Sequence, residues 1–153
     1  MNPQWTGWDA DETKLRSVKG ACMALTLVNM ALSLGCGMIP TGVTRHNWVS
    51  FAATLALVAL MVQVIAAVRF GLAKPMLDPR SFSSIHQMMR WPAQCHILLM
   101  TIAFIAGCHS CVTAFAGLTD ILVMLSFLLS AGGSFALMKI YGSVRVCEVD
   151  VPQ

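Results

Sequence analysis

Four long apolar blocks constrain this chain more than any other feature. They cover residues 18–39, 48–70, 93–116 and 120–141. At about 1.5 Å per residue, roughly 20 helical residues cross the hydrocarbon core of a bilayer, so each block is long enough for one crossing. Only 11% of the residues are charged, whereas soluble domains carry about 25%. The blocks predict an all-α integral membrane protein with one domain, residues 1–153, built as a four-span transmembrane helix bundle.

The segments between the blocks carry start and stop signals for helices. The third and fourth blocks meet at "GLTD", where Gly117 and Thr119–Asp120 predict a break and a helix N-cap. In the N-terminal arm, Asp9 is the expected N-cap of a helix that continues into the first span. The middle loop, "DPRSFSSIHQMMRWP", has apolar residues at helical spacing between Pro79 and Pro92. It predicts a short interfacial helix that ends at Pro92, with an irregular loop as the alternative.

The basic residues predict how the bundle is oriented. An even number of spans places both termini on one side, and nine of the ten Lys and Arg residues fall on that side. Cytoplasmic or matrix loops of membrane proteins are enriched in Lys and Arg, so we expect both termini on the inner side. Aromatic residues that prefer the interface are expected to follow the same map, with Trp5, Trp8, Trp91 and Tyr141 inside and Trp48 outside. The nine inner basic residues are Lys14, Arg16, Lys19, Arg69, Lys74, Arg80, Arg90, Lys139 and Arg145, and the outer one is Arg45.

Small and weakly polar residues recur at spacings of three and four along the spans. Such residues let membrane helices approach closely and hydrogen-bond, because burying leucine among lipid tails drives no association. Asn29 and Gln63 are expected to face protein, since an unpaired amide in lipid costs several kcal/mol. They either hydrogen-bond across the bundle, which is the favoured interpretation, or bind an ion, a quinone or another ligand. The predicted polar seam comprises Asn29, Ser33, Gln63, Gly107, Ser110, Ser126, Ser130 and Gly133.

The stretch "IAGCHSCVTAF" places Cys108, His109 and Cys111 within four residues. Cys108 and Cys111 are three apart and share a helix face, whereas His109 points about 100° away from Cys108. Because at most two ligands converge, the cysteines are expected to pack as small apolar residues in the core or at an interface. The alternatives are a disulfide with Cys36 and, less favoured, a metal or haem site.

Haem would need two histidines at one depth on different helices. His96 and His109 are on one helix, so they cannot pair. His46 could reach His109 only from the first outer loop, and His86 could meet His96 near the inner surface. Neither pairing is compelling, and no cofactor or metal is expected.

Several function classes are disfavoured by what the spans lack. No Asp, Glu, Lys or Arg lies deep in any block, although such charges usually mark proton relays and ion pathways. No nucleophile–base pair, phosphate loop or metal cluster is visible, so the chain is not expected to be an enzyme or to act on a soluble substrate. No segment combines basic and aromatic residues as nucleic-acid binding requires. The expected partners are the lipid bilayer and other membrane protein subunits.

Residues 29–42, "NMALSLGCGMIPTG", resemble the first span of the CD20-like tetraspans. Four spans with both termini inside are also the layout of the MARVEL group. The long inner loop and the short second outer loop depart from CD20-like proteins, and no functional residue is carried over. This resemblance implies one alternative function, a self-assembling membrane organiser or channel regulator.

The favoured hypothesis is a non-catalytic accessory subunit of a larger membrane complex. A second alternative is a haem- or quinone-associated anchor of a redox enzyme. The minimal outer loops and the absence of an Asn-x-Ser/Thr sequon favour a mitochondrial or other energy-transducing inner membrane.

Overall fold

Four long helices make up most of the chain. The computed structural model describes residues 5–37, 39, 41–113 and 117–149. The helices are α1 (Glu12–Gly37), α2 (Asn47–Leu72), α3 (Pro79–Thr113) and α4 (Leu118–Gly142). All four are long and apolar enough to cross a membrane. The prediction of an all-α, four-span, multi-pass membrane protein is therefore confirmed, and residues 114–116 of the third predicted span lie outside the described residues.

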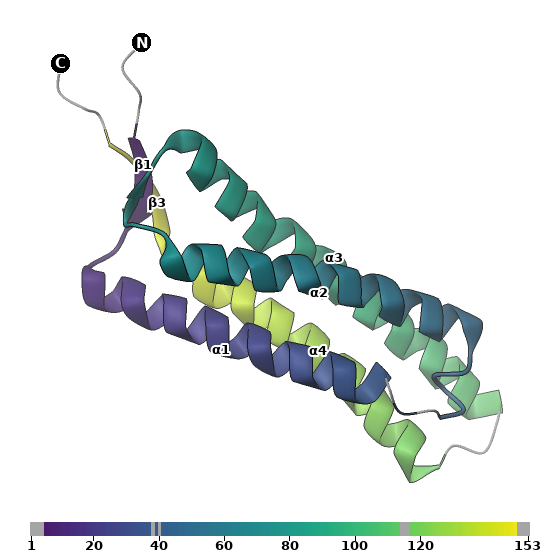
Figure 1. Cartoon of the computed structure of the whole chain (residues 1–153). Coiled ribbons are helices and arrows are strands. Elements are labelled where there is room, and N and C mark those ends of the chain that lie inside the picture. The colour runs from purple at the N-terminus through teal and green to yellow at the C-terminus, as the bar shows by residue number, and fades with distance from the viewer. Residues whose placement is uncertain (1–4, 38, 40, 114–116, 150–153) are drawn as a thin grey trace.

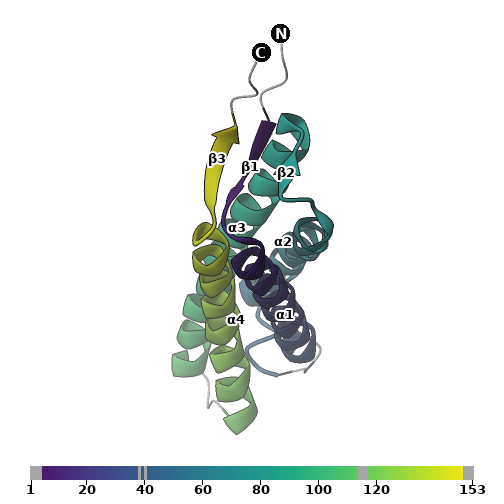
Figure 2. The ribbon, with the colours of Figure 1, turned by 90° about the vertical axis from the view of Figure 1, so that its left-hand side faces the viewer.

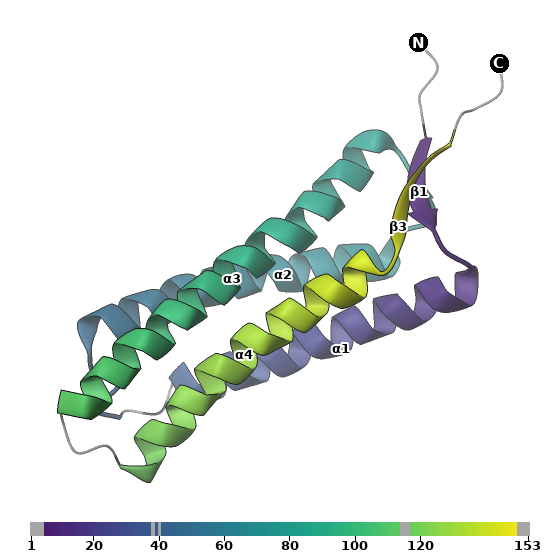
Figure 3. The same ribbon diagram turned by 180° about the vertical axis from the view of Figure 1, so that it is seen from behind.

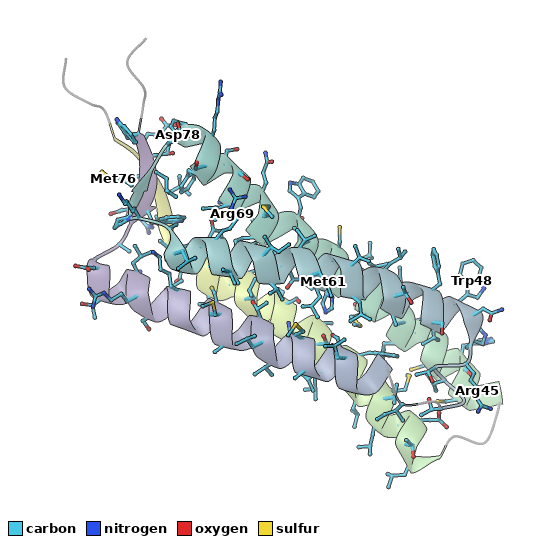
Figure 4. The ribbon with its side chains drawn as sticks, in the orientation of Figure 1. Arg45, Trp48, Met61, Arg69, Met76 and Asp78 are labelled. Atoms are coloured by element: carbon cyan, nitrogen blue, oxygen red, sulfur yellow. The ribbon has the colours of Figure 1, made fainter. Side chains whose placement is uncertain are left out.

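The helices run antiparallel, up and down, and form a closed ring (Figures 1 and 3). Each helix packs on two neighbours, in the order α1–α2–α3–α4 and back to α1. Both described chain ends lie at one end of the bundle, here called the sheet end, and the α1–α2 connection lies at the other, the loop end. Arg69 is near the sheet end, whereas Arg45 and Trp48 are at the loop end (Figure 4).

Helix α3 corrects the expectation of a separate interfacial helix. It runs without a break through Pro92 for 35 residues, a length of about 52 Å against roughly 30 Å of hydrocarbon. Proline is tolerated inside membrane helices because neighbouring groups can satisfy the backbone that it disturbs. The carbonyl that Pro92 disturbs is that of Met88, four residues earlier, because proline has no N–H to donate. Gln63 Nε2 of α2 donates to the Pro92 carbonyl oxygen at 3.2 Å, which ties α2 to α3 beside the proline. The segment 79–92 therefore extends the third span instead of lying flat beside it.

A small antiparallel sheet closes one end of the bundle and was not predicted. Its strands are β1 (Trp5–Asp9), β2 (Met76–Leu77) and β3 (Arg145–Val149), in the order β2-β1-β3. Gly7 pairs with Met76 on one side and with Cys147 on the other. The sheet thus joins the N-terminal arm, the α2–α3 connection and the C-terminal segment above the helices (Figure 2).

Two predicted helix starts differ from the structure. Asp9 ends β1, and Asp11 caps α1 instead, with its carboxylate accepting from the Lys14 backbone N–H at 2.6 Å. As expected, that helix continues directly into the first span. Gly117 is the N-cap of α4, and Asp120 lies in the first turn. The Asp120 carboxylate accepts from the Gly117 N–H at 3.1 Å and from the Val43 N–H at 3.1 Å, so it ties both loop-end connections together.

Aromatic rings fill the space between the helices and the sheet. Trp8 is 4% exposed and packs against the protein, whereas Trp48 and Trp91 are exposed at 70% and 67%. The expected interfacial belt stays a prediction. The Trp8 ring lies 5.0 Å from that of Phe70 and 5.1 Å from that of Phe82. Lys19 Nζ sits over the Trp8 and Phe70 rings and donates to the Ala73 carbonyl oxygen at the end of α2. The N-terminal arm is thereby anchored to the bundle by packing and by a charge-assisted helix cap.

Helix α4 illustrates the inverted polarity of the bundle. Leu122, Leu128 and Leu129 point outward and are 52–61% exposed, while Ser126 and Ser130 face inward at 6% and 1%. A helix that is apolar outside and polar inside suits lipid better than water. The interior of the bundle is therefore where its polar side chains gather.

Candidate functional site

Polar side chains from all four helices meet in the middle of the bundle. Each is at most 6% exposed, and each donates to or accepts from a group on another helix. We call this set the core polar network. It comprises Asn29 and Ser33 of α1, Gln63 of α2, His96 of α3, and Ser130 and Ser134 of α4.

One chain of hydrogen bonds crosses the bundle through Ser134. Asn29 Nδ2 donates to Ser134 Oγ at 3.1 Å, and the Ser134 hydroxyl donates to Gln63 Oε1 at 3.3 Å. Gln63 Nε2 then donates to the Pro92 carbonyl oxygen at 3.2 Å. These three bonds connect α1 to α4, α4 to α2, and α2 to α3.

A second chain runs parallel to the first through Ser130, one helical turn away on α4. His96 Nδ1 lies 3.0 Å from the Ala56 carbonyl oxygen, and His96 Nε2 lies 2.9 Å from Ser130 Oγ. The carbonyl can only accept, so Nδ1 carries a hydrogen. A charged imidazole without a counter-ion is costly in the apolar interior, so the ring is neutral and Nε2 accepts from the Ser130 hydroxyl. Ser33 Oγ, 3.0 Å from Ser130 Oγ, then acts as the donor to Ser130.

Glycine allows the Asn29 amide to reach its partner. A Cβ added to Gly133 would lie 2.0 Å from Asn29 Oδ1, far inside contact distance. Gly133 was predicted as a seam residue, but the adjacent Ser134, which makes two of the interhelical bonds, was missed. The signal was available, because Ser126, Ser130 and Ser134 repeat at exact intervals of four residues on one helix face.

Ser126 and Gly107, two further predicted seam residues, pack without joining the core polar network. The Ser126 hydroxyl donates to the Val123 carbonyl oxygen of its own helix at 2.5 Å. Gly107 is buried where α3 meets α4, and a Cβ there would lie 2.2 Å from Met124 Sδ. Ser110 is partly buried near the loop end. Ser126 therefore contributes a hydrogen bond within its own helix, and Gly107 contributes close helix packing.

The Ser130–His96 contact has the geometry of a nucleophile and its base, which the sequence did not reveal. Such pairs activate serine when the base is oriented by a third group and the substrate can enter. Here the Ala56 carbonyl orients the imidazole, but Ser130 is 1% and His96 is 0% exposed. Neither residue lines the two surface pockets described below. The arrangement is therefore suited to holding helices together.

The cysteines and histidine of the third span lie near the loop end. Cys108 is exposed on the bundle surface, whereas Cys111 is partly buried against the core. The expectation that they pack in the core or at an interface stays a prediction for Cys108. His46 and His109 line one groove of about 440 Å³ together with Trp48 and Ile105. The Cys36 side chain lies outside the described residues, so its proposed pairing stays a prediction. In the described part of the chain, no three His, Cys, Asp or Glu side chains are grouped as metal ligands.

The two remaining histidines are bonded to other partners. His86 Nδ1 lies 3.1 Å from the Tyr141 hydroxyl, and His96 is engaged by Ser130 and Ala56. The sequence left open a meeting of these two histidines near the inner surface, and the structure does not bring them together.

Comparison with protein-family models, with curated proteins and with solved structures finds no match to this chain. The residues and their geometry therefore carry the functional inference.

Proposed function

We propose that this protein is a non-catalytic structural or accessory subunit of a larger membrane complex. The observation that supports the proposal best is the core polar network. Its side chains bond to one another and to helix carbonyls, so they connect the four helices instead of surrounding a space for a substrate. A bundle whose four helices are joined in this way can pack against other subunits as one preassembled unit.

The sheet end supports the same proposal. Three chain segments that would otherwise be loose arms are joined there by the strands and by the aromatic cluster around Trp8. β3 forms one edge of the sheet. Exposed edges and cationic side chains are features through which subunits recognise partners. Because minimal loop-end connections leave little surface for a receptor, we also propose an energy-transducing inner membrane as the location.

Gentle affinity purification tests the proposal. The tagged chain is extracted in two mild detergents, and co-purifying proteins are quantified by mass spectrometry beside a visible absorption spectrum. We expect the same partners in constant ratio in both detergents, and none of them with an unrelated four-span protein carrying the same tag. Homo-oligomers alone would contradict the proposal in favour of a membrane organiser, and a haem spectrum or bound quinone would do so in favour of a redox anchor.

The Ser130–His96 pair offers a separate test of the non-catalytic role. A fluorophosphonate probe forms a covalent bond with activated serines, and Ser130→Ala supplies the control. We expect no labelling of the wild-type protein in membranes. Labelling that disappears in Ser130→Ala would show an activated nucleophile and overturn the proposal.

A further inference from the structure

A second pocket lies at the sheet end, where α3, α4 and β3 meet. Its volume is about 380 Å³, and its lining includes His86 and Arg90 of α3, Tyr141 of α4, and Arg145 of β3. Val144 and Val146 add an apolar wall. The pocket thus combines two guanidinium groups from different elements with a histidine, a tyrosine and aliphatic surface.

The two arginines form no ion pair with any acidic side chain in the described part of the chain. Within residues 5–37, 39, 41–113 and 117–149, the only ion pair within 4.0 Å joins Arg16 to Glu12. Asp9 is opposite Arg145 in the β1–β3 register, but the two side chains form no ion pair. Arginine presents five N–H donors in a planar fork that matches phosphate oxygens. Unpaired guanidinium groups in one pocket therefore favour an anion with several oxygens.

Arg90 is held in position by a short hydrogen-bond chain. Its Nη1 lies 3.4 Å from His86 Nε2, and His86 Nδ1 lies 3.1 Å from the Tyr141 hydroxyl. Arg90 can only donate, so Nε2 accepts and Nδ1–H donates to Tyr141. The Tyr141 ring is 4% exposed and packs 5.1 Å from Phe70. The chain thus fixes one edge of the guanidinium to the core and leaves its other donors for a ligand.

The position of the pocket matches the depth of lipid headgroups. Trp91, adjacent to Arg90, is 67% exposed, and tryptophan prefers the membrane interface. The α3 helix exceeds the hydrocarbon thickness, so its sheet-end portion reaches headgroup level. Basic pockets between spans at this depth suit acidic headgroups, and an apolar wall suits the adjoining glycerol and acyl chains. We propose that this pocket binds the phosphate group of an anionic phospholipid.

The test uses the full-length protein in mild detergent and native mass spectrometry. Phosphatidylglycerol, phosphatidylcholine and inorganic phosphate are titrated separately. The test variant is Arg90→Gln with Arg145→Gln, and the control is Lys74→Gln with Arg80→Gln, which removes the same charge from exposed positions outside the pocket. A third variant, Arg90→Lys with Arg145→Lys, keeps the charge but loses the planar fork. Circular dichroism checks that all variants retain the wild-type helical content.

We expect one phosphatidylglycerol molecule to bind at least ~10-fold more tightly than phosphatidylcholine. Both lipids carry a phosphate, but phosphatidylcholine also carries a choline cation, which the two guanidinium groups repel and which cancels the net negative charge. The glutamine pair should weaken this binding at least ~10-fold, the lysine pair should lie between, and the control pair should stay within ~2-fold. Equal weakening in the test and control pairs would overturn the proposal, because the attraction would then be unspecific. Inorganic phosphate that binds as tightly as phosphatidylglycerol would also overturn it and assign the pocket to a free anion.

Discussion

Replacing Ser134 with alanine tests whether the core polar network holds the helices together. Ser134 is 0% exposed and makes two interhelical bonds, at 3.1 Å with Asn29 Nδ2 and at 3.3 Å with Gln63 Oε1. Alanine keeps most of the volume and removes both bonds at once. The Asn29 N–H and the Gln63 carbonyl oxygen are then left buried without these partners.

The magnitude follows from two bonds lost in an apolar interior. An interhelical hydrogen bond in a membrane protein contributes about 0.6 kcal/mol on average and up to about 1.7 kcal/mol. Leaving a buried polar group unpaired costs about 1–3 kcal/mol in general. We therefore expect Ser134→Ala to lower the free energy of unfolding by about 2 kcal/mol.

Ser126→Ala is the matched control. Ser126 is also buried on α4 and also loses a hydroxyl, but its bond at 2.5 Å goes to the Val123 carbonyl oxygen of its own helix. That carbonyl keeps its helical N–H partner, so we expect a loss of about 0.5 kcal/mol or less. Unfolding in mixed micelles of a mild detergent and dodecyl sulfate, followed by circular dichroism, measures both variants. Equal stability of the two variants would refute a network that holds the helices together.

Two further pairs of substitutions test other contacts. Gly133→Ala should lower the free energy of unfolding by about 1–3 kcal/mol, since the new methyl group would displace the Asn29 amide. Gly132→Ala is the control and should be neutral or slightly stabilising, because nothing lies within 4 Å of its added Cβ. Similar melting temperatures for the two variants would contradict the close approach of Asn29 to Gly133. Cys108→Ala with Cys111→Ala should cost about 1 kcal/mol or less, because one side chain is exposed and the other partly buried, and a stoichiometric metal in the wild-type protein that this variant loses would overturn that expectation.

The spans could be predicted because their cause is local. Length and apolar composition alone decide whether a segment can cross a bilayer, and all four predicted spans correspond to helices. The residue at which a helix ends depends also on contacts with other helices. Pro92 is a typical stop signal, yet α3 continues through it and packs there against α2, whose Gln63 donates to the Pro92 carbonyl oxygen. No pattern within residues 79–92 contains that information.

The sheet escaped prediction for a related reason. Its three strands are short and come from segments far apart in the chain, so each is stable only when it pairs with the others. "WTGWD" carries no strong alternation, and β2 has only two residues. The burial of Trp8 follows from that pairing, because β1 carries its ring over Phe70 and Phe82.

The sequence predicts which polar side chains face the interior of the bundle, but it does not predict their hydrogen-bond partners. Spacing along each helix identifies which residues share a face, and it selected Asn29, Ser33, Gln63 and Ser130. It does not say how far one helix is rotated or shifted against the next. His96 therefore joins Ser130 and Ala56 by a geometry that only the assembled bundle defines.

The most direct test of the central claim is the topology of the bundle in its membrane. We expect the sheet end, with both described chain ends and nine of the ten basic residues, to face the inner side, and the loop end with Arg45 to face outward. Reporter fusions placed after Gly42 and after Lys74 measure the two ends separately. We expect the fusion after Gly42 to report the outer side and the fusion after Lys74 to report the inner side. The same side for both, or the reverse assignment, would contradict this topology.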